Sequence, residues 1–323
     1  MNIEMIQAAS ERLHGNILRT PLLSDPALDR IAGRQVLVKA ECLQHTGSFK
    51  ARGGWAAVSA LSDDQRRRGV IAYSSGNHAQ GVARAAAEMG APAVIVRPSD
   101  APAIKIASTR ALGAEVVLYE RGSENREAIG EALAAGRGLT LIRPYDEPEV
   151  IAGQGTCGLE IAVQAGTRGV TEAEVLVCCG GGGLTSGIAL ALESRAPGLT
   201  VRPVEPEGFD DVARSLRSGR IESNERTSGG LCDAILTPAP GEITFPILSR
   251  LCGPGLVVTE DECLRAMGLA FSRLKIVVEP GGAAALAAAL FHGAEIAGDA
   301  VIAVATGGNV DRTVFERALA TLD

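Results

Sequence analysis

Lys50 is the residue whose surroundings most strongly suggest covalent chemistry. It lies in the run HTGSFKARGG at residues 45–54, among small and hydroxylated neighbours with few carboxylates nearby. Most lysines are solvated surface charges, but a lysine amine can also attack a carbonyl group and form a Schiff base. We therefore treat Lys50 as a candidate covalent residue, to be weighed together with the other motifs of the chain.

A glycine loop is the second feature with chemical meaning. Four consecutive glycines and a leucine follow an apolar run that predicts a strand at 174–179; they are Gly180, Gly181, Gly182, Gly183 and Leu184. Glycine backbones at a strand-to-helix turn expose N–H groups, and the helix N-terminus adds the positive end of its dipole. A tight turn needs only one or two glycines, and four lose much backbone entropy on folding. The loop therefore predicts a phosphate site.

Two nucleotide-binding motifs fit this loop poorly. A Walker loop continues with Gly-Lys-Ser/Thr, whereas Leu184 follows the glycines here. The dinucleotide fingerprint G-x-G-x-x-G fails because Thr185 stands at the third glycine position. Glu205, however, ends the next expected strand, where a ribose-binding acid would lie. A nicotinamide enzyme therefore stays open as an alternative.

Two polar turns also follow expected strands. Residues 74–81 read SSGNHAQG, and Thr306 begins the run TGGN after the last expected strand. Short hydroxyl and amide side chains at the carboxyl end of a strand suit recognition of a carboxylate or a ring hydroxyl, whereas a helix N-cap needs only one serine. His78 alone is more typical of a packed structural histidine. Ligands of open α/β sheets bind at this edge.

An acidic segment at residues 205–211 contains four carboxylates: Glu205, Glu207, Asp210 and Asp211. The simpler interpretation is a solvated acidic turn, and the segment alone favours it. The alternative is a hard-cation site, because Mg²⁺ and Ca²⁺ bind carboxylate and carbonyl oxygens.

Alternating strand and helix patterns would position these motifs. Strands are expected at 35–40, 70–74, 93–96, 115–118, 174–179, 200–204, 256–258 and 300–305, and helices at 51–61, 81–89, 101–112, 124–135, 187–196 and 261–274. Such alternation predicts an α/β fold built from βαβ units with parallel sheet. The run 70–144 reads as a compact unit that could form a smaller domain.

Composition excludes several classes of protein. The 323 residues are 46% hydrophobic but only 3% aromatic, with 39 glycines, which favours helices packed on a sheet over a β-sandwich. A net charge of −7 without a basic block argues against nucleic-acid binding. The chain has no 18-residue apolar run and no signal-peptide pattern, so we expect no membrane span.

Cysteine usage points to a reducing compartment. The seven cysteines are odd in number and form no C-x-x-C pair, which is typical of free thiols in the cytoplasm. Four histidines without clustered ligands argue against a zinc site.

In combination, the motifs resemble those of the fold-type II pyridoxal-phosphate enzymes, and within them the serine/threonine dehydratase and serine racemase family. The resemblance covers nearly the whole chain through T-G-S-F-K-A-R, S-S-G-N-H-A-Q-G, I-A-G-Q-G-T, G-G-G-G-L and T-G-G-N, in that order. It implies a tryptophan synthase β-like fold with two open, twisted, mostly parallel sheets flanked by helices. It also implies a large cofactor-binding domain of residues 1–65 and 147–323 and a small mobile domain of residues 66–146.

The resemblance implies a cofactor role for each matched position. Pyridoxal 5′-phosphate would form a Schiff base with Lys50, lie against Phe49 and accept a hydrogen bond at its 3′-oxygen from Asn77. The loop from Gly180 to Leu184 would hold its phosphate, and Thr306 would face its pyridine nitrogen. A neutral hydroxyl there does not keep that nitrogen protonated, which makes the ring a weaker electron sink and favours prompt loss of a β-leaving group.

Substrate contacts follow from the same resemblance. Ser75 matches the serine that faces the cofactor opposite the lysine in serine racemase, which makes it a second catalytic candidate. With it, the substrate site would include Ser74, Gly76, Asn77, His78, Arg126 and Arg143. Arg126 resembles an arginine that reaches dicarboxylate ligands, and Arg143 replaces the histidine of a His-Pro-x-x-x-Pro motif. Two arginines would suit a second substrate carboxylate, as in 3-hydroxyaspartate.

The resemblance favours the other interpretation of the acidic segment. Glu205, the carbonyl of Phe209, and Asp211 match the divalent-cation site of the racemase-like branch, so Mg²⁺ (or Mn²⁺ or Ca²⁺) is favoured there. A cytoplasmic homodimer is also implied. No second regulatory domain is expected after the catalytic portion.

The implied activity is loss of water from a β-hydroxy amino acid, with 3-hydroxyaspartate ranked above threonine and serine. An amino acid racemase on the same site is the main alternative. A β-replacement synthase is disfavoured because related synthases carry aspartate where Ala51 stands. A binding protein without activity is disfavoured because Lys50 and the glycine loop are intact.

Overall fold

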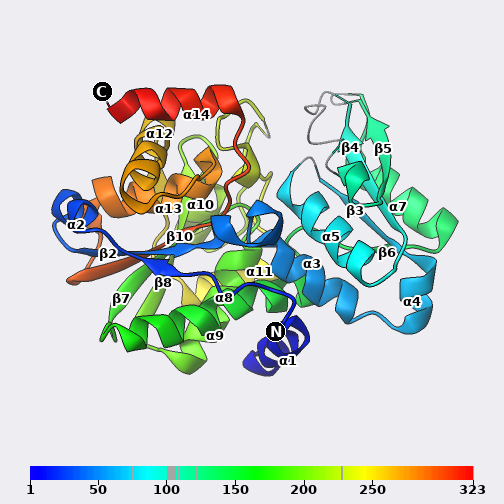
Figure 1. Ribbon diagram of the computed structural model, residues 1–323, viewed down its shortest axis with the longest axis horizontal. Helices are drawn as coiled ribbons and strands as arrows, with labels where there is room; N and C mark the ends of the chain where they lie inside the picture. The colour runs from blue at the N-terminus through cyan, green and yellow to red at the C-terminus, as the bar shows by residue number, and fades with distance from the viewer. Residues whose placement is uncertain (75, 100–106, 108, 121–122, 227, 323) are drawn as a thin grey trace.

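Two separate β-sheets organise the molecule (Figure 1). The computed structural model describes residues 1–74, 76–99, 107, 109–120, 123–226 and 228–322. Around the sheets lie α1 (Ile3–Leu13), α2 (Pro26–Ala32), α3 (Lys50–Ser59), α4 (Asp63–Arg68), α5 (Asn77–Glu88), α7 (Arg126–Arg137), α8 (Pro148–Thr167), α9 (Gly183–Arg195), α10 (Asp211–Ser218), α11 (Thr244–Leu251), α12 (Glu260–Leu269), α13 (Pro280–Phe291) and α14 (Arg312–Leu319).

The larger sheet has six strands in the order β1-β2-β10-β7-β8-β9. Only the β1–β2 pairing is antiparallel. The strands are β1 (Leu22–Leu23), β2 (Gln35–Ala40), β7 (Ala173–Cys178), β8 (Leu199–Pro206), β9 (Leu256–Val258) and β10 (Ala300–Ala305). Figure 1 shows α8 and α9 below this sheet and α12, α13 and α14 above it.

Alternation along the central strands explains why helices cover both faces. On β10, Val301 and Ala303 join the core shared with α12 and α13, whereas Ile302 and Val304 join the core shared with α8 and α9. Successive side chains of a strand point to opposite faces, so a strand that is apolar throughout must be buried on both sides.

The smaller sheet has four parallel strands in the order β5-β4-β3-β6. They are β3 (Val70–Tyr73), β4 (Ala93–Pro98), β5 (Glu115–Tyr119) and β6 (Thr140–Leu141). All four fall inside the segment 66–146 that we assign to a small domain. The boundaries and the mobility of that domain remain predictions.

Helix α3 lies between the two sheets and packs closely on α5 (Figure 1). A Cβ atom on Gly54 would come within 2.6 Å of the Gly81 carbonyl carbon, and one on Gly81 within 2.6 Å of the Lys50 carbonyl oxygen. Real side chains do not tolerate such distances. The two glycines therefore let the backbones of α3 and α5 come into direct contact next to Lys50.

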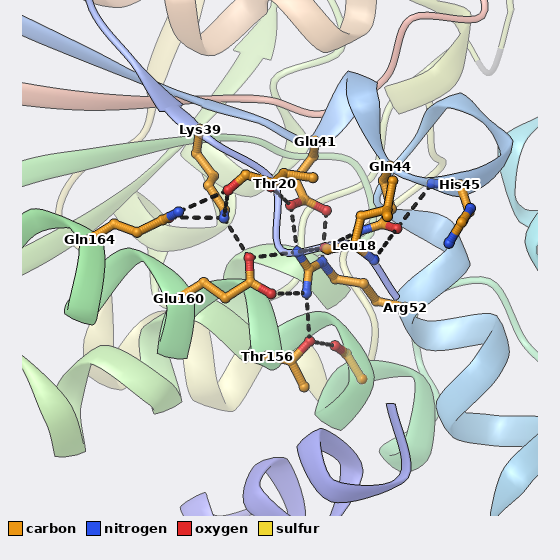
Figure 2. A network of polar contacts seen from close by, with 11 residues as sticks. Leu18, Thr20, Lys39, Glu41, Gln44, His45, Arg52, Thr156, Glu160 and Gln164 are labelled. Carbon is orange, nitrogen blue, oxygen red and sulfur yellow. Dashed lines mark hydrogen bonds and ion pairs between the residues drawn. The ribbon is translucent and has the colours of Figure 1, made fainter. Parts of the chain in front are cut away.

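A buried ionic cluster centred on Arg52 fixes the other side of α3 (Figure 2). The Arg52 guanidinium donates to both carboxylate oxygens of Glu41, to both of Glu160 and to the Thr156 hydroxyl, at 2.7–3.1 Å. Lys39 Nζ donates to Glu160 at 2.5 Å. We call this group of five residues the Arg52 cluster. It ties α3 to β2 and α8 and contains two cations and two carboxylates.

The strand predictions are confirmed with small differences at their ends, and the α/β architecture with mostly parallel sheets is confirmed too. Strands β1 and β6 were not predicted, because two residues carry no readable alternation. Helices α5 and α9 begin four residues earlier than expected, at the polar and glycine turns themselves. The helix expected at 101–112 falls largely outside the described residues.

None of the described helices is long and apolar enough to cross a membrane. All seven cysteines are free thiols.

Candidate active site

A cavity between the two sheets collects the motifs of the sequence. It lies at the carboxyl ends of β2, β3, β7 and β10, where the loops from these strands converge. Parallel strands bring the loops after their carboxyl ends to one edge of a sheet. The predicted residues that line the cavity are Phe49, Lys50, Ser74, Gly76, Asn77, His78, Arg126, Gly180, Gly181, Gly182, Gly183, Leu184 and Thr306.

Lys50 is one of the basic residues that line this cavity. It is the first residue of α3, and its Nζ donates to the Pro144 carbonyl at 2.6 Å. No ion pair to Lys50 is present within the part of the chain that the structure describes. Burial lowers the pKa of Lys50 from 10.5 to about 8, because desolvation disfavours the charged amine. A substantial share of its amine is therefore neutral and nucleophilic near physiological pH.

The glycine loop forms another part of the cavity wall. Gly182 has φ +90°, which a residue with a side chain rarely adopts, and α9 begins at the next residue. A Cβ on Gly181 would come within 2.1 Å of the Tyr145 ring, so only glycine leaves room for that ring. A glycine loop that lines a cavity at a helix N-terminus fits a phosphate group.

The turn after β10 is paired with the Lys50 segment. Phe49 N donates to the Thr306 carbonyl at 3.1 Å, and Ser48 and Gly307 form an isolated antiparallel bridge. Thr306 is buried and lines the same cavity as Phe49 and Lys50.

Three residues of the polar turn after β3 are fixed by hydrogen bonds. The Ser74 hydroxyl accepts from Gly76 N at 3.1 Å, and Asn77 Nδ2 donates to Glu279 Oε1 at 2.6 Å. His78 Nε2 contacts the Ile142 carbonyl at 2.9 Å. Burial, with a smaller contribution from Lys50, lowers the pKa of His78 to about 3. His78 is therefore neutral, as expected for a packed histidine. Ser75 lies outside the described residues.

The two candidate substrate arginines have different positions. Arg126 lines the cavity, and its guanidinium lies 5.8 Å from the centre of the Tyr73 ring, itself a lining residue. Arg143 is exposed, pairs with Glu131 at 3.5 Å and is absent from the described cavity lining. The structure thus brings Arg126 to the site and leaves Arg143 outside it.

Sequence reasoning missed several cavity residues, among them Tyr73, Tyr145 and Glu279. Glu279 directly precedes α13, and its N–H donates to the Gly307 carbonyl at 2.9 Å. The run Glu-Pro-Gly-Gly at 279–282 could have signalled this position, since proline marks a helix start and the glycines allow close approach. Tyr145 had no comparable signal.

The candidate cation site lies at the end of β8. Glu205 is fully buried and accepts hydrogen bonds from Val212 N and Ala213 N at 2.9 and 2.7 Å. Asp211 is also buried. Its Oδ1 accepts from Asn224 at 2.5 Å, whereas its buried Oδ2 has no hydrogen-bond partner. Burial and then the charge of Asp211 raise the pKa of Glu205 well above its usual range, and burial raises that of Asp211 to about 7.

Across the described chain, no cluster of three or more His, Cys, Asp or Glu side chains could hold a metal ion. The predicted site is consistent with this result, because its third ligand is the backbone carbonyl of Phe209. Two adjacent buried carboxylates, one with an unpartnered oxygen, fit a hard cation.

Comparisons with known proteins agree with this geometry. The family model for "pyridoxal-phosphate dependent enzyme" matches residues 13–307. An L-threo-3-hydroxyaspartate ammonia-lyase from Pseudomonas sp is 44% identical over 94% of this chain and 93% of the relative. A serine racemase from Schizosaccharomyces pombe is 38% identical over 95% and 93%. A solved threonine deaminase from T.th. is 46% identical, covers 96% of this chain and 99% of its own, and has a TM-score of 0.90.

The residues present fit the cofactor of these relatives. A lysine with a lowered pKa, a glycine cradle for phosphate and flanking amide and hydroxyl groups share one cavity. The chain therefore belongs to the pyridoxal-phosphate-dependent enzymes, in the fold-type II group that contains the threonine deaminases and serine racemases.

Proposed function

We propose that this protein is a dehydratase, or ammonia-lyase, that removes water from a β-hydroxy amino acid, with 3-hydroxyaspartate preferred over threonine and serine. The observation that carries the substrate preference is Arg126 at the cavity wall. A cation there suits a distal carboxylate, which 3-hydroxyaspartate has and the other two lack. The name of the relative from Pseudomonas supports the same choice.

Different cavity residues would bind different parts of the cofactor. The loop from Gly180 to Gly183 would hold the cofactor phosphate, Phe49 would lie against its ring, Asn77 would donate to its 3′-oxygen and Thr306 would face its nitrogen. When bound, pyridoxal 5′-phosphate supplies an electron-withdrawing ring that acidifies the Cα proton of the amino acid.

Lys50 would act twice. Its neutral amine would bind the cofactor covalently, and once displaced by the substrate amine it would take the Cα proton. Its pKa of about 8 suits proton transfer near neutral pH. The β-hydroxyl would leave as water, whose second hydrogen is in net terms the proton that Lys50 takes from Cα. The enamine product would tautomerise to an imine, and hydrolysis of the imine would consume one water and give a keto acid and ammonia.

A screen of ammonia release tests the proposal. Purified holoenzyme would be assayed with all stereoisomers of 3-hydroxyaspartate, serine and threonine, with and without Mg²⁺. Arg126→Met should raise the KM for 3-hydroxyaspartate about tenfold or more, since a charge-assisted hydrogen bond contributes roughly 1.5–3 kcal/mol, and should leave serine nearly unaffected.

Arg143→Met is the matched control, because it removes an arginine that the structure leaves outside the cavity. Absence of ammonia from all three amino acids would refute the lyase assignment. Equal effects of the two substitutions would refute the role of Arg126 but not the reaction.

Racemisation on the same site is the second candidate. It is supported by the 38% identity to a serine racemase and by Ser75, which is predicted to face the cofactor opposite Lys50. Chiral analysis of recovered substrate separates the two activities, since a lyase consumes amino acid whereas a racemase returns both enantiomers.

We also propose that Glu205, the Phe209 carbonyl and Asp211 bind Mg²⁺ or a similar divalent cation. The unpartnered Asp211 Oδ2 and the two adjacent buried carboxylates support this site. A homodimer in the cytoplasm completes the proposal. Light scattering and cell fractionation would test the oligomeric state and the location.

A further inference from the structure

A chain of side-chain hydrogen bonds joins four segments at the cavity. Asn309 Nδ2 donates to Asn77 Oδ1 and to the Thr46 carbonyl, each at 2.8 Å. Asn77 Nδ2 in turn donates to Glu279 Oε1 at 2.6 Å. Thr46 belongs to the Lys50 segment, Asn77 begins α5, Glu279 precedes α13, and Asn309 follows β10. These contacts connect the two sheets at the point where the cofactor would bind.

The two ends of an asparagine amide differ, and this difference fixes which group donates in each hydrogen bond of the series. An asparagine side chain has an acceptor end with one oxygen and a donor end with two N–H groups. Asn309 uses both N–H groups, on Thr46 and on Asn77. Asn77 uses its oxygen on Asn309 and one N–H on Glu279, so its second N–H is available to the cavity that it lines.

The reversed orientation of Asn77 is disfavoured at both ends. Its N–H groups would then face the Asn309 donor, and its oxygen would face the Glu279 carboxylate. The first contact would set two N–H donors against each other and the second would set two acceptor oxygens against each other, so both hydrogen bonds of Asn77 would be lost and replaced by repulsion.

The backbone around Asn309 is shaped to hold it. Gly47 has φ +73°, and a Cβ there would come within 2.6 Å of Asn309 Oδ1. The Gly308 N–H donates to the Gly47 carbonyl at 2.9 Å. Gly47 therefore lets the turn after β10 approach the Lys50 segment closely enough for Asn309 to reach both of its acceptors.

We propose that Asn309 is a positioning residue that orients Asn77, so that one Asn77 N–H points at the ring oxygen of the cofactor. This inference rests on the proposed function, in which Asn77 binds that oxygen. Asn309 itself need not touch the cofactor or the substrate. Its contribution should therefore disappear when Asn77 is absent.

A double-mutant cycle tests this dependence without measuring turnover. The variants are Asn309→Ala, Asn77→Ala and the double variant, each prepared as apoprotein and titrated with pyridoxal 5′-phosphate. Asn309→Ala should weaken cofactor binding about three- to tenfold, as expected for loss of one net hydrogen bond. It should also shift the absorption band of the bound cofactor in the same direction as Asn77→Ala. The double variant should be no worse than Asn77→Ala.

Asn309→Asp keeps the shape of the side chain and guards against misfolding of the alanine variant. Its carboxylate cannot donate to Asn77 or Thr46, so the band shift should be at least as large. Asn16→Ala is the matched control, because the Asn16 side chain donates to the Arg12 and His14 carbonyls and is not among the described residues that line the cavity. It should leave both the affinity and the band unchanged.

The outcomes separate the inference from the proposed function. A normal band and normal affinity in Asn77→Ala would refute the cofactor role of Asn77. An altered Asn77→Ala beside an unaltered Asn309→Ala would overturn the inference alone. Fully additive effects, or a lower melting temperature of Asn309→Ala and Asn309→Asp with an unchanged band, would also overturn it and leave Asn309 a structural residue.

Discussion

Lys50 and Arg52 lie two residues apart on α3, yet their surroundings differ in charge. Arg52 is 1% exposed and contacts two carboxylates, and the Arg52 cluster as a whole is neutral (Figure 2). Lys50 lines the cavity and donates to a neutral carbonyl. Helix α3 therefore carries on one side Arg52, whose charge is neutralised by carboxylates, and on the other side Lys50, which has no ion pair with any described residue.

The two regions also differ in how easily their charges change. Burial alone would raise the pKa of Glu41, but the charge and hydrogen bonds of Arg52 hold that pKa below its usual value. Lys50 has only desolvation acting on it, and its pKa falls to about 8. A paired cluster keeps its charges and orders the backbone, whereas an unpaired group can lose its proton and react. Glu205 and Asp211 show the same effect in acidic groups, because burial raises the pKa of each carboxyl group.

Breaking the Arg52 cluster should have the largest effect. Arg52→Met would leave Glu41 buried without its cation, and removing one partner of a buried ion pair typically lowers the free energy of unfolding by about 3–5 kcal/mol. Urea denaturation of the apoprotein measures this change. Adding Glu41→Gln should recover part of the loss. A loss under about 1 kcal/mol would show that the cluster is not a structural anchor.

The amine of Lys50 should titrate far below an ordinary lysine. With a pKa of about 8 instead of 10.5, it presents about a hundredfold more neutral amine at pH 8 than an unshifted lysine. Because only the neutral amine reacts, acylation of the apoprotein at Lys50 should rise with pH to a midpoint of about 8. Competitive labelling followed by mass spectrometry gives this midpoint.

The same labelling of the urea-unfolded chain is the control in this experiment. A Lys50 midpoint as high in the folded protein as in the unfolded chain would mean that the cavity does not desolvate the amine. The lowered pKa also makes stability depend on pH. Burial destabilises the charged amine, so the folded state carries the full cost below pH 8, and this cost fades as the pH rises toward 10.5.

Divalent cations should stabilise the protein through Glu205 and Asp211. Ligand at a hundred times its dissociation constant adds about 2.7 kcal/mol to the free energy of unfolding. Because the pKa of Asp211 is raised to about 7, protonation should weaken the response to Mg²⁺ as the pH falls below 7. Thermal unfolding with EDTA and with Mg²⁺ at several pH values measures both effects.

Asp211→Asn should abolish the stabilisation by Mg²⁺. The exposed Glu207→Gln, in the same acidic segment, should preserve it. An equal response of both variants would show that the cation binds elsewhere or only nonspecifically.

The comparison also shows what could be read from the sequence. Lys50 and the glycine loop were predictable, because their chemistry depends on local spacing that stays together when the chain folds. The Arg52 cluster was not, because Lys39, Glu41, Arg52 and Glu160 come from separate elements and each resembles an ordinary surface charge in the sequence. The position of Arg143 outside the cavity likewise depends on the path of the chain after β6.

The smallest effect should come from an ion pair with the same chemistry at the surface. Arg250 pairs with Glu193 at 2.5 Å, and both side chains are about half exposed. Water screens the attraction and ordering the two long side chains opposes it, so Glu193→Gln should change the free energy of unfolding by less than about 0.5 kcal/mol. The same urea titration used for Arg52→Met measures it. A loss of several kcal/mol here would mean that ion pairing itself, rather than burial, sets the strength of the Arg52 cluster.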